Sequence, residues 1–142
     1  MANDITIESM AGMQQAFLVE DFLSSLTVSF SSIKDNNLSN FQFFQGIAVN
    51  GPSIASIKGT RFTNNQRLEH AVYVAGEALV DLEDIRMVGN SGTVDVPGTL
   101  SSLVFATDSG SQAVLIRTSF DDNTDYIVSV TCGSAEPQFS IF

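Results

Sequence analysis

The chain has 142 residues, the usual size of one domain, and its six basic and sixteen acidic residues give a net charge of −10 at pH 7. Because nucleic acids and anionic membranes both attract cations, this balance argues against binding to either. Charged residues make up 15% of the chain, below the usual share of about a quarter, so uncharged polar residues must provide much of the surface.

No internal repeat, low-complexity tract or long linker divides the sequence, so we expect one domain over residues 1–142, with residues 1–25 as an N-terminal arm or helix. The N-terminus has no basic segment followed by an apolar run, so we expect no signal peptide and synthesis in a host cytoplasm. Residues 9–24 are predicted to form a short helix, because Met13 and Phe17 continue an apolar spacing of three and four.

Three strands are expected in the next part of the chain. Leu26, Val28 and Phe30 alternate with hydroxyl residues, which is the pattern of a half-buried strand. An aromatic and β-branched run at 41–49 and a shorter run at 54–57 follow. Turn residues separate these strands at 34–37, 50–52 and 59.

Residues 66–88 have two interpretations. Leu68, Val72 and Leu79 belong to an apolar stripe with helical spacing. Against a helix stand the β-branched residues around Tyr73, Gly76 in the middle of the run, and the alternation of apolar and charged residues that follows. We favour strands, and a helix remains the alternative.

The last third of the chain is predicted to be β-structure. The runs 103–106 and 113–116 flank an Asp-Ser-Gly turn and are expected to form a hairpin, and 126–132 is expected to pair with the strand before it. The predicted fold is therefore mainly β, an antiparallel sandwich or small barrel with one short N-terminal helix. The alternative is an α+β fold with a second helix at 66–88.

The sequence offers no recognisable catalytic or cofactor site. The single histidine, His70, leaves no room for a multi-histidine metal site, and no nucleophile elbow or phosphate-binding glycine motif is present. Cys132 lies in an alternating apolar run, where it is expected to be a small buried residue. We therefore predict that the chain is not an enzyme and takes no cofactor.

One acidic segment has part of a calcium-binding pattern. Asp121, Asn123 and Asp125 occupy the first, third and fifth positions of a calcium loop, but the turn glycine and the final glutamate of that motif are missing. We interpret the segment as an acidic turn, with a loop-bound Ca²⁺ as the alternative.

Two groups of residues are candidates for contact with a protein partner. The first is aromatic, because aromatic side chains dominate interface energetics. Its members are Phe41, Phe43, Phe44, Phe139 and Phe142. The second is a set of cations within one ten-residue window, either a solvated loop or a docking patch for an acidic partner. Its members are Lys58, Arg61 and Arg67.

The run Ala71-Val-Tyr-Val-Ala-Gly-Glu-Ala-Leu-Val80, followed by Asn90-Ser-Gly92 and Val94-Asp-Val-Pro-Gly98, resembles the small capsid decoration (cement) proteins of tailed bacteriophages. The resemblance implies a non-enzymatic virion protein, a homotrimer that binds the outside of a phage head and stabilises contacts between major capsid subunits. The alternative is a β-sandwich binding or adhesion module, for example part of a tail fibre, that uses Ca²⁺.

Overall fold

The computed structural model describes residues 1–8, 15–20, 24–37, 44–92, 102–108, 110–124, 126–131 and 138–141. For residues 44, 126–131 and 138–141 it describes the backbone alone. All the secondary-structure elements in this part of the chain are β-strands. These residues therefore contain no helix that could cross a membrane.

The strands form three sheets, and every pair of neighbouring strands is parallel. Sheet A contains β1 (Ala2–Asn3), β4 (Ser25–Ser29), β7 (Ile54–Lys58), β10 (Leu79–Glu83), β13 (Gln112–Ile116) and β16 (Gln138–Ile141). Sheet B contains β2 (Thr6–Glu8), β5 (Ser32–Lys34), β8 (Arg61–Thr63), β11 (Arg86–Val88) and β14 (Ser119–Asp121). Sheet C contains β3 (Gln15–Val19), β6 (Phe44–Val49), β9 (Leu68–Val74), β12 (Ser102–Thr107) and β15 (Tyr126–Thr131).

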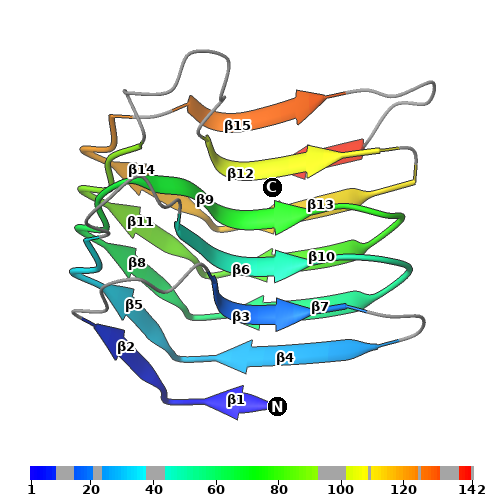
Figure 1. The fold of residues 1–142 in the computed structure, drawn as a ribbon, viewed down its shortest axis with the longest axis horizontal. Helices are drawn as coiled ribbons and strands as arrows, with labels where there is room; N and C mark the ends of the chain where they lie inside the picture. The colour runs from blue at the N-terminus through cyan, green and yellow to red at the C-terminus, as the bar shows by residue number, and fades with distance from the viewer. Residues whose placement is uncertain are drawn as a thin grey trace.

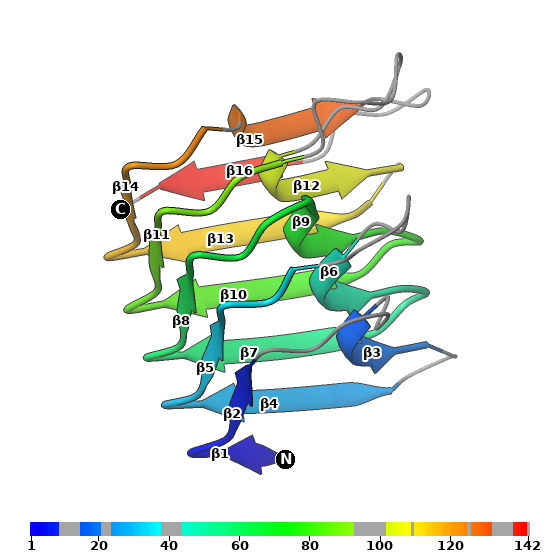
Figure 2. The same cartoon turned by 60° about the vertical axis from the view of Figure 1, so that its left-hand side comes forward.

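The chain visits sheets A, B and C in turn and then returns to sheet A one level higher, so the fold is a β-solenoid. Figures 1 and 2 show the stacked coils, with the N-terminus at one end of the stack and the colours progressing toward the other. The predicted antiparallel sandwich or barrel is therefore wrong. The alternation of apolar and polar residues does not distinguish a sandwich from a solenoid, because the sheets of both folds have one buried and one solvent-facing side.

The structure also corrects the expected helix at 9–24 and the alternative helix at 66–88. Residues 15–19 of the predicted N-terminal helix form β3, and its residues 9–14 and 21–23 lie outside the described part of the chain. The 66–88 region contains β9, β10 and β11, so strands are confirmed there and the helix is wrong.

The strand pairings expected in the last third are wrong as well. The runs at 103–106 and 113–116 form no hairpin, because β12 belongs to sheet C and β13 to sheet A. Likewise, β15 pairs with β12 of the coil below and not with the strand before it. The turn residues were identified at the right places, but they form corners between sheets.

Residues with positive φ mark these corners. At the corner after sheet A they are Asp4, Phe30, Gly59, Asp84 and Arg117, and at the corner after sheet B they are Asp35, Asn64, Gly89 and Asp122. The second corner uses only Asp, Asn and Gly, the residue types that adopt this conformation at least cost. A change of chain direction is thus encoded at the same place in successive coils.

The corner after sheet B also carries a ladder of asparagines, of which Asn36, Asn65 and Asn90 are buried. The Nδ2 of Asn36 donates to the Oδ1 of Asn65, Asn65 donates to Asn90, and Asn90 donates to Asn123, each over 2.9 Å. These residues are 29, 25 and 33 positions apart in the chain. The structure therefore has repeats that the sequence analysis did not recognise, because the loops between the ladder residues differ in length.

The core lies between the three sheets. On the inner side of sheet B, Ile33, Phe62 and Met87 are in register on β5, β8 and β11 and are fully buried. Burial of one such side chain contributes roughly 1.5–3 kcal/mol. Because strand residues alternate between faces, the residues beside these three must point outward.

Candidate binding face

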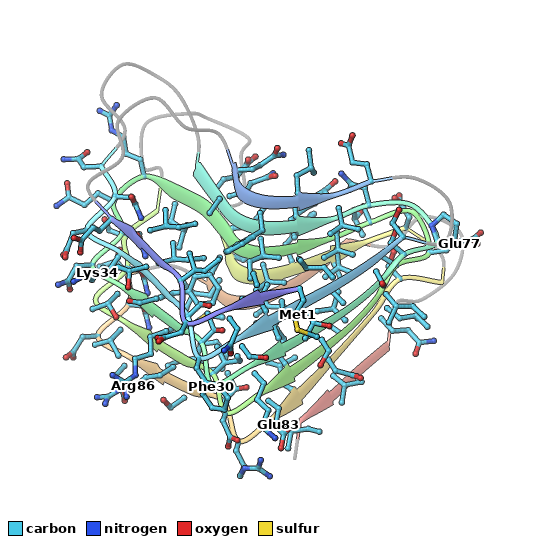
Figure 3. The ribbon with its side chains drawn as sticks, turned by 90° about the horizontal axis from the view of Figure 1, so that it is seen from below. Met1, Phe30, Lys34, Glu77, Glu83 and Arg86 are labelled. Atoms are coloured by element: carbon cyan, nitrogen blue, oxygen red, sulfur yellow. The ribbon has the colours of Figure 1, made fainter. Side chains whose placement is uncertain are left out.

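The outer side of sheet B carries three cations on three neighbouring strands. Lys34 lies on β5, Arg61 on β8 and Arg86 on β11, and each is adjacent in sequence to a buried inner residue. We call these three residues the basic face. Lys34 and Arg86 lie on the same side of the solenoid when it is viewed from below (Figure 3).

Arg61 and Arg86 are direct neighbours across the sheet. They are paired in register on β8 and β11, and the row continues to Ser32 below and Ser119 above. Neighbouring strands are about 4.8 Å apart, so two guanidinium groups begin from adjacent rungs. Like charges in such positions repel each other, and this repulsion disfavours the arrangement unless an anion relieves it.

The cations of the basic face differ in the carboxylates they contact. Lys34 Nζ lies 2.7 Å from Glu8, which raises the pKa of Lys34, and Arg86 Nε lies 4.0 Å from Asp121. Arg61 is exposed and forms no ion pair with any described residue. In a chain with a large excess of carboxylates, this leaves positive charge available for a ligand.

The corner between sheets A and B has a different arrangement, in which cations and carboxylates neutralise each other. Lys58 lies 3.0 Å from Glu83, and Arg117 contacts Glu83 and also forms two hydrogen bonds to Asp84, of 2.6 and 3.0 Å. Lys58 and Arg117 hold the pKa of Glu83 below its usual range, and Arg117 does the same for Asp84. The two carboxylates in turn raise the pKa of Arg117.

All the cations of this acidic chain thus lie on sheet B or at its two corners. They are Lys34, Lys58, Arg61, Arg67, Arg86 and Arg117. Of the predicted cluster, Arg61 is on the face itself, Lys58 is at the corner toward sheet A, and Arg67 is beyond the corner toward sheet C with φ +57°. The structure brings Arg61 together with Arg86, which the ten-residue window did not include.

The sequence itself contains a signal that places Arg61 beside Arg86. Arg61 and Arg86 each immediately precede the inner apolar residue of an apolar-x-x-Asn segment, Phe62–Asn65 and Met87–Asn90. Alignment of these segments would have placed both arginines at the same position of consecutive coils.

His70 is the buried member of an aromatic cluster on sheet C. Its Nδ1 is 3.3 Å from both the Oγ and the carbonyl oxygen of Ser102, and its ring stacks on Phe105 with ring centroids 4.5 Å apart and on Tyr73 at 5.5 Å. Burial lowers the pKa of His70 from 6.5 to about 4, although the bond to Ser102 acts in the opposite direction. A Ser–His contact resembles a nucleophile and its base, but His70 is 3% exposed and Ser102 1%, so the arrangement suits packing.

Of the three predicted calcium residues, the structure describes Asp121 and Asn123. The Oδ1 of Asn123 accepts from Asn90 and its Nδ2 donates to the carbonyl of Met87, so both ends of this side chain belong to the ladder. Asp121 is exposed near Arg86, and Asp125 lies outside the described residues. Among the described residues no three His, Cys, Asp or Glu side chains are close enough to hold a metal ion.

The aromatic interface candidates fall mostly where side chains are not described. Phe44 pairs in register with Leu68, and Phe139 with Ala113. Phe41, Phe43, Phe142 and Cys132 lie outside the described residues.

Comparisons with known proteins add no family to these observations. No family model matches the chain, and no curated protein and no solved structure matches it. The fold and the distribution of charge are therefore the observations on which a function rests.

Proposed function

We propose that the chain is a non-enzymatic binding module that docks an acidic protein surface on its basic face. The observation that supports this most directly is Arg61, an exposed guanidinium next to Arg86 in register and without an ion pair among the described residues. A carboxylate placed between the two guanidinium groups would relieve their repulsion and form charge-assisted hydrogen bonds to both.

The regular geometry of sheet B favours a protein partner over a small molecule. Arg61 and Arg86 lie on the outer side of short strands, in a row with the hydroxyl residues Ser32 and Ser119, and small molecules generally need a concave site. Arg is also enriched at protein interfaces, while the other charged residues are depleted there. The capsid decoration role and the homotrimer implied by the resemblance remain predictions, and a docking face of this kind is compatible with them.

The proposal is tested with a fluorescent polyglutamate peptide as the acidic probe, its binding measured by anisotropy at low ionic strength. The whole chain carries a net charge of −10 and should repel such a peptide, so binding would report a local basic site. The double variant Arg61→Ala/Arg86→Ala should weaken binding by at least about tenfold. Added salt should weaken it in the unchanged chain.

The matched control is the double variant Lys58→Ala/Arg117→Ala, which removes the same amount of positive charge from cations already paired with Glu83 and Asp84. It should stay within about threefold of the unchanged chain, because paired cations offer little to a second carboxylate. Equal losses in the two double variants, or no binding to the unchanged chain, would show that the basic face is not a docking site.

A further inference from the structure

A second surface of the molecule combines exposed carboxylates with exposed apolar side chains. Ile54 and Leu79 are paired in register on the outer side of β7 and β10 and are 57% and 41% exposed. Exposed carboxylates surround them. Glu77 and Asp108 lie at the corner where the chain passes from sheet C to sheet A, and Asp81 lies on β10 beside Leu79. We call these five residues the acidic patch.

Carboxylates in the acidic patch are free of cations within the described part of the chain. None of Glu77, Asp81 and Asp108 forms an ion pair there, and the cations are at sheet B and its corners. The carboxylate of Asp108 accepts a hydrogen bond from the backbone N–H of Gly76 at 3.2 Å. Viewed from below, Glu77 lies on the opposite side of the cross-section from Lys34 and Arg86 (Figure 3).

The two surfaces have the same spacing. Arg61 and Arg86 lie on consecutive coils of sheet B, and Glu77 and Asp108 follow consecutive strands of sheet C, β9 and β12. The acidic patch also has an apolar component at this spacing, because Ile54 and Leu79 are in register on neighbouring strands of sheet A. Because parallel strands repeat about every 4.8 Å in both, two solenoids with parallel axes can align coil against coil.

We infer that the acidic partner of the basic face is a second copy of this chain, which presents its acidic patch. This inference rests on the proposed function and gives it a specific partner. In the contact, Glu77 and Asp81 or Asp108 of one copy face Arg61 and Arg86 of the next, and Ile54 and Leu79 are covered. Burial of those two apolar side chains adds a term that is independent of salt.

The geometry also determines what kind of assembly would form. Since the two surfaces differ and lie on opposite sides of the molecule, the contact is heterologous, and each added copy leaves one basic face and one acidic patch free. Side-by-side rows of solenoids follow, with growth that depends on protein concentration and is opposed by salt.

The experiment measures the size distribution of the full chain by sedimentation velocity over a range of concentrations, at low and high ionic strength. Two charge-reversal variants separate the surfaces. Arg61→Glu/Arg86→Glu makes both surfaces acidic, and Glu77→Lys/Asp81→Lys makes both basic while leaving the hydrogen bond of Asp108 intact. Each variant alone should self-associate at least about tenfold more weakly than the unchanged chain.

An equimolar mixture of the two variants should associate again, because every contact then joins an acidic surface to a basic one. The control is Gln66→Glu/Thr124→Glu, which adds carboxylates at exposed positions beyond sheet B and should self-associate as the unchanged chain does. Circular dichroism confirms that each variant is folded.

Three results would overturn the inference. They are a monomer at every concentration in low salt, self-association that neither charge reversal weakens, or variants that stay monomeric when mixed. If one of these results is found but polyglutamate still binds at the Arg61–Arg86 pair, the proposed function stands and the acidic partner is a different protein. Loss of both polyglutamate binding and self-association would remove the two together.

Discussion

Asn65 is the residue at which the interior of the solenoid depends most on hydrogen bonding. It is fully buried, its Nδ2 donates to the carbonyl of Ile33 and to Asn90, and its Oδ1 accepts from the side chain of Asn36. Buried amide groups of this kind are costly when a partner is removed, because each one left without a bond loses roughly 1–3 kcal/mol. The ladder therefore tolerates no apolar substitute in its middle.

We predict that Asn65→Ala lowers the free energy of unfolding by about 3 kcal/mol or more, as measured by urea denaturation. The neighbouring variant Asn64→Gly is the control. Asn64 is exposed with φ +53°, a conformation that glycine adopts freely, so this change should cost less than about 0.5 kcal/mol. Similar midpoints for the two variants would show that the ladder contributes little.

His70 gives the stability of the fold a specific pH dependence. Its pKa is about 4 in the folded chain and 6.5 in the absence of burial, so the unfolded chain binds the proton more readily. Stability from neutral His70 is fully present above pH 6.5 and declines as the pH falls toward 4. The lowered pKa of His70 corresponds to a loss of roughly 3 kcal/mol at most from the free energy of unfolding.

The test compares urea unfolding of the unchanged chain and His70→Phe between pH 7 and pH 4. Phenylalanine retains a ring that can stack on Phe105 but does not titrate, so the variant should lose much less stability over this range. Carboxylates such as Glu83 titrate in both proteins and cancel in the comparison. Parallel pH profiles would contradict the assigned role of His70.

At the scale of single strands, β6 approaches both the backbone of β9 and the core of sheet B at Gly46. A Cβ atom at this position would lie 2.6 Å from the backbone oxygen of Ala71 and 2.7 Å from the ring of Phe62. The backbone of β9 is held in the middle of sheet C and cannot move away. Gly46 is therefore required by space, which differs from Gly59, where positive φ is the main reason.

We predict that Gly46→Ala destabilises the chain by about 3 kcal/mol and that Gly59→Ala costs only about 1 kcal/mol. Gly59 has φ +59°, and the atom that would meet its Cβ belongs to the ring of Phe30, which is 64% exposed and free to turn. Thermal or urea unfolding of both variants gives the order. A cost for Gly59→Ala equal to or above that of Gly46→Ala would show that β9 yields more easily than expected.

Individual strands could be predicted from the sequence, whereas their partners could not. The alternation at 26–29 and at 54–57 matches β4 and β7, because each strand has one buried and one exposed side, whereas Phe30 lies beyond β4 with positive φ and is 64% exposed. Alternation is the same in parallel and antiparallel sheets, so the turn that contains Asp108 and Gly110 predicted a hairpin, although these two residues lie where the chain passes from sheet C to sheet A. The signal for stacked coils is the asparagine that recurs in each coil. It is hard to recognise because loops of unequal length place these asparagines 29, 25 and 33 residues apart.

Only part of the candidate site could be predicted from the sequence, for the same reason. Arg61 was recognised within a local cluster, but Arg86 is in the next coil and joins it only through the parallel register of β8 and β11. Asn123, part of the alternative calcium loop, accepts a hydrogen bond from Asn90 of the previous coil, a contact that its chain neighbours do not indicate. Chain neighbours predict a site poorly where each coil brings together residues that are far apart in sequence.

At the scale of the whole molecule, the solenoid gathers its cations on one side, where several of them pair with carboxylates. Cations occupy sheet B and its corners, and Glu77 marks the opposite side (Figure 3). A chain with a net charge of −10 repels itself at low ionic strength, both within one molecule and between molecules. Salt therefore acts in two directions, since it screens the general repulsion and also the specific attraction between the basic face and the acidic patch.

We predict that these two effects have opposite signs in one salt titration. Self-association measured by sedimentation should fall as salt is added, while the thermal midpoint of the dilute, monomeric chain should rise, because screening relieves intramolecular repulsion more than it weakens the exposed ion pairs. The variant Arg61→Glu/Arg86→Glu, which is more negative and cannot use the basic face, should show the larger rise. A midpoint that falls with salt would mean that local pairs such as Arg117 with Asp84 outweigh the net charge.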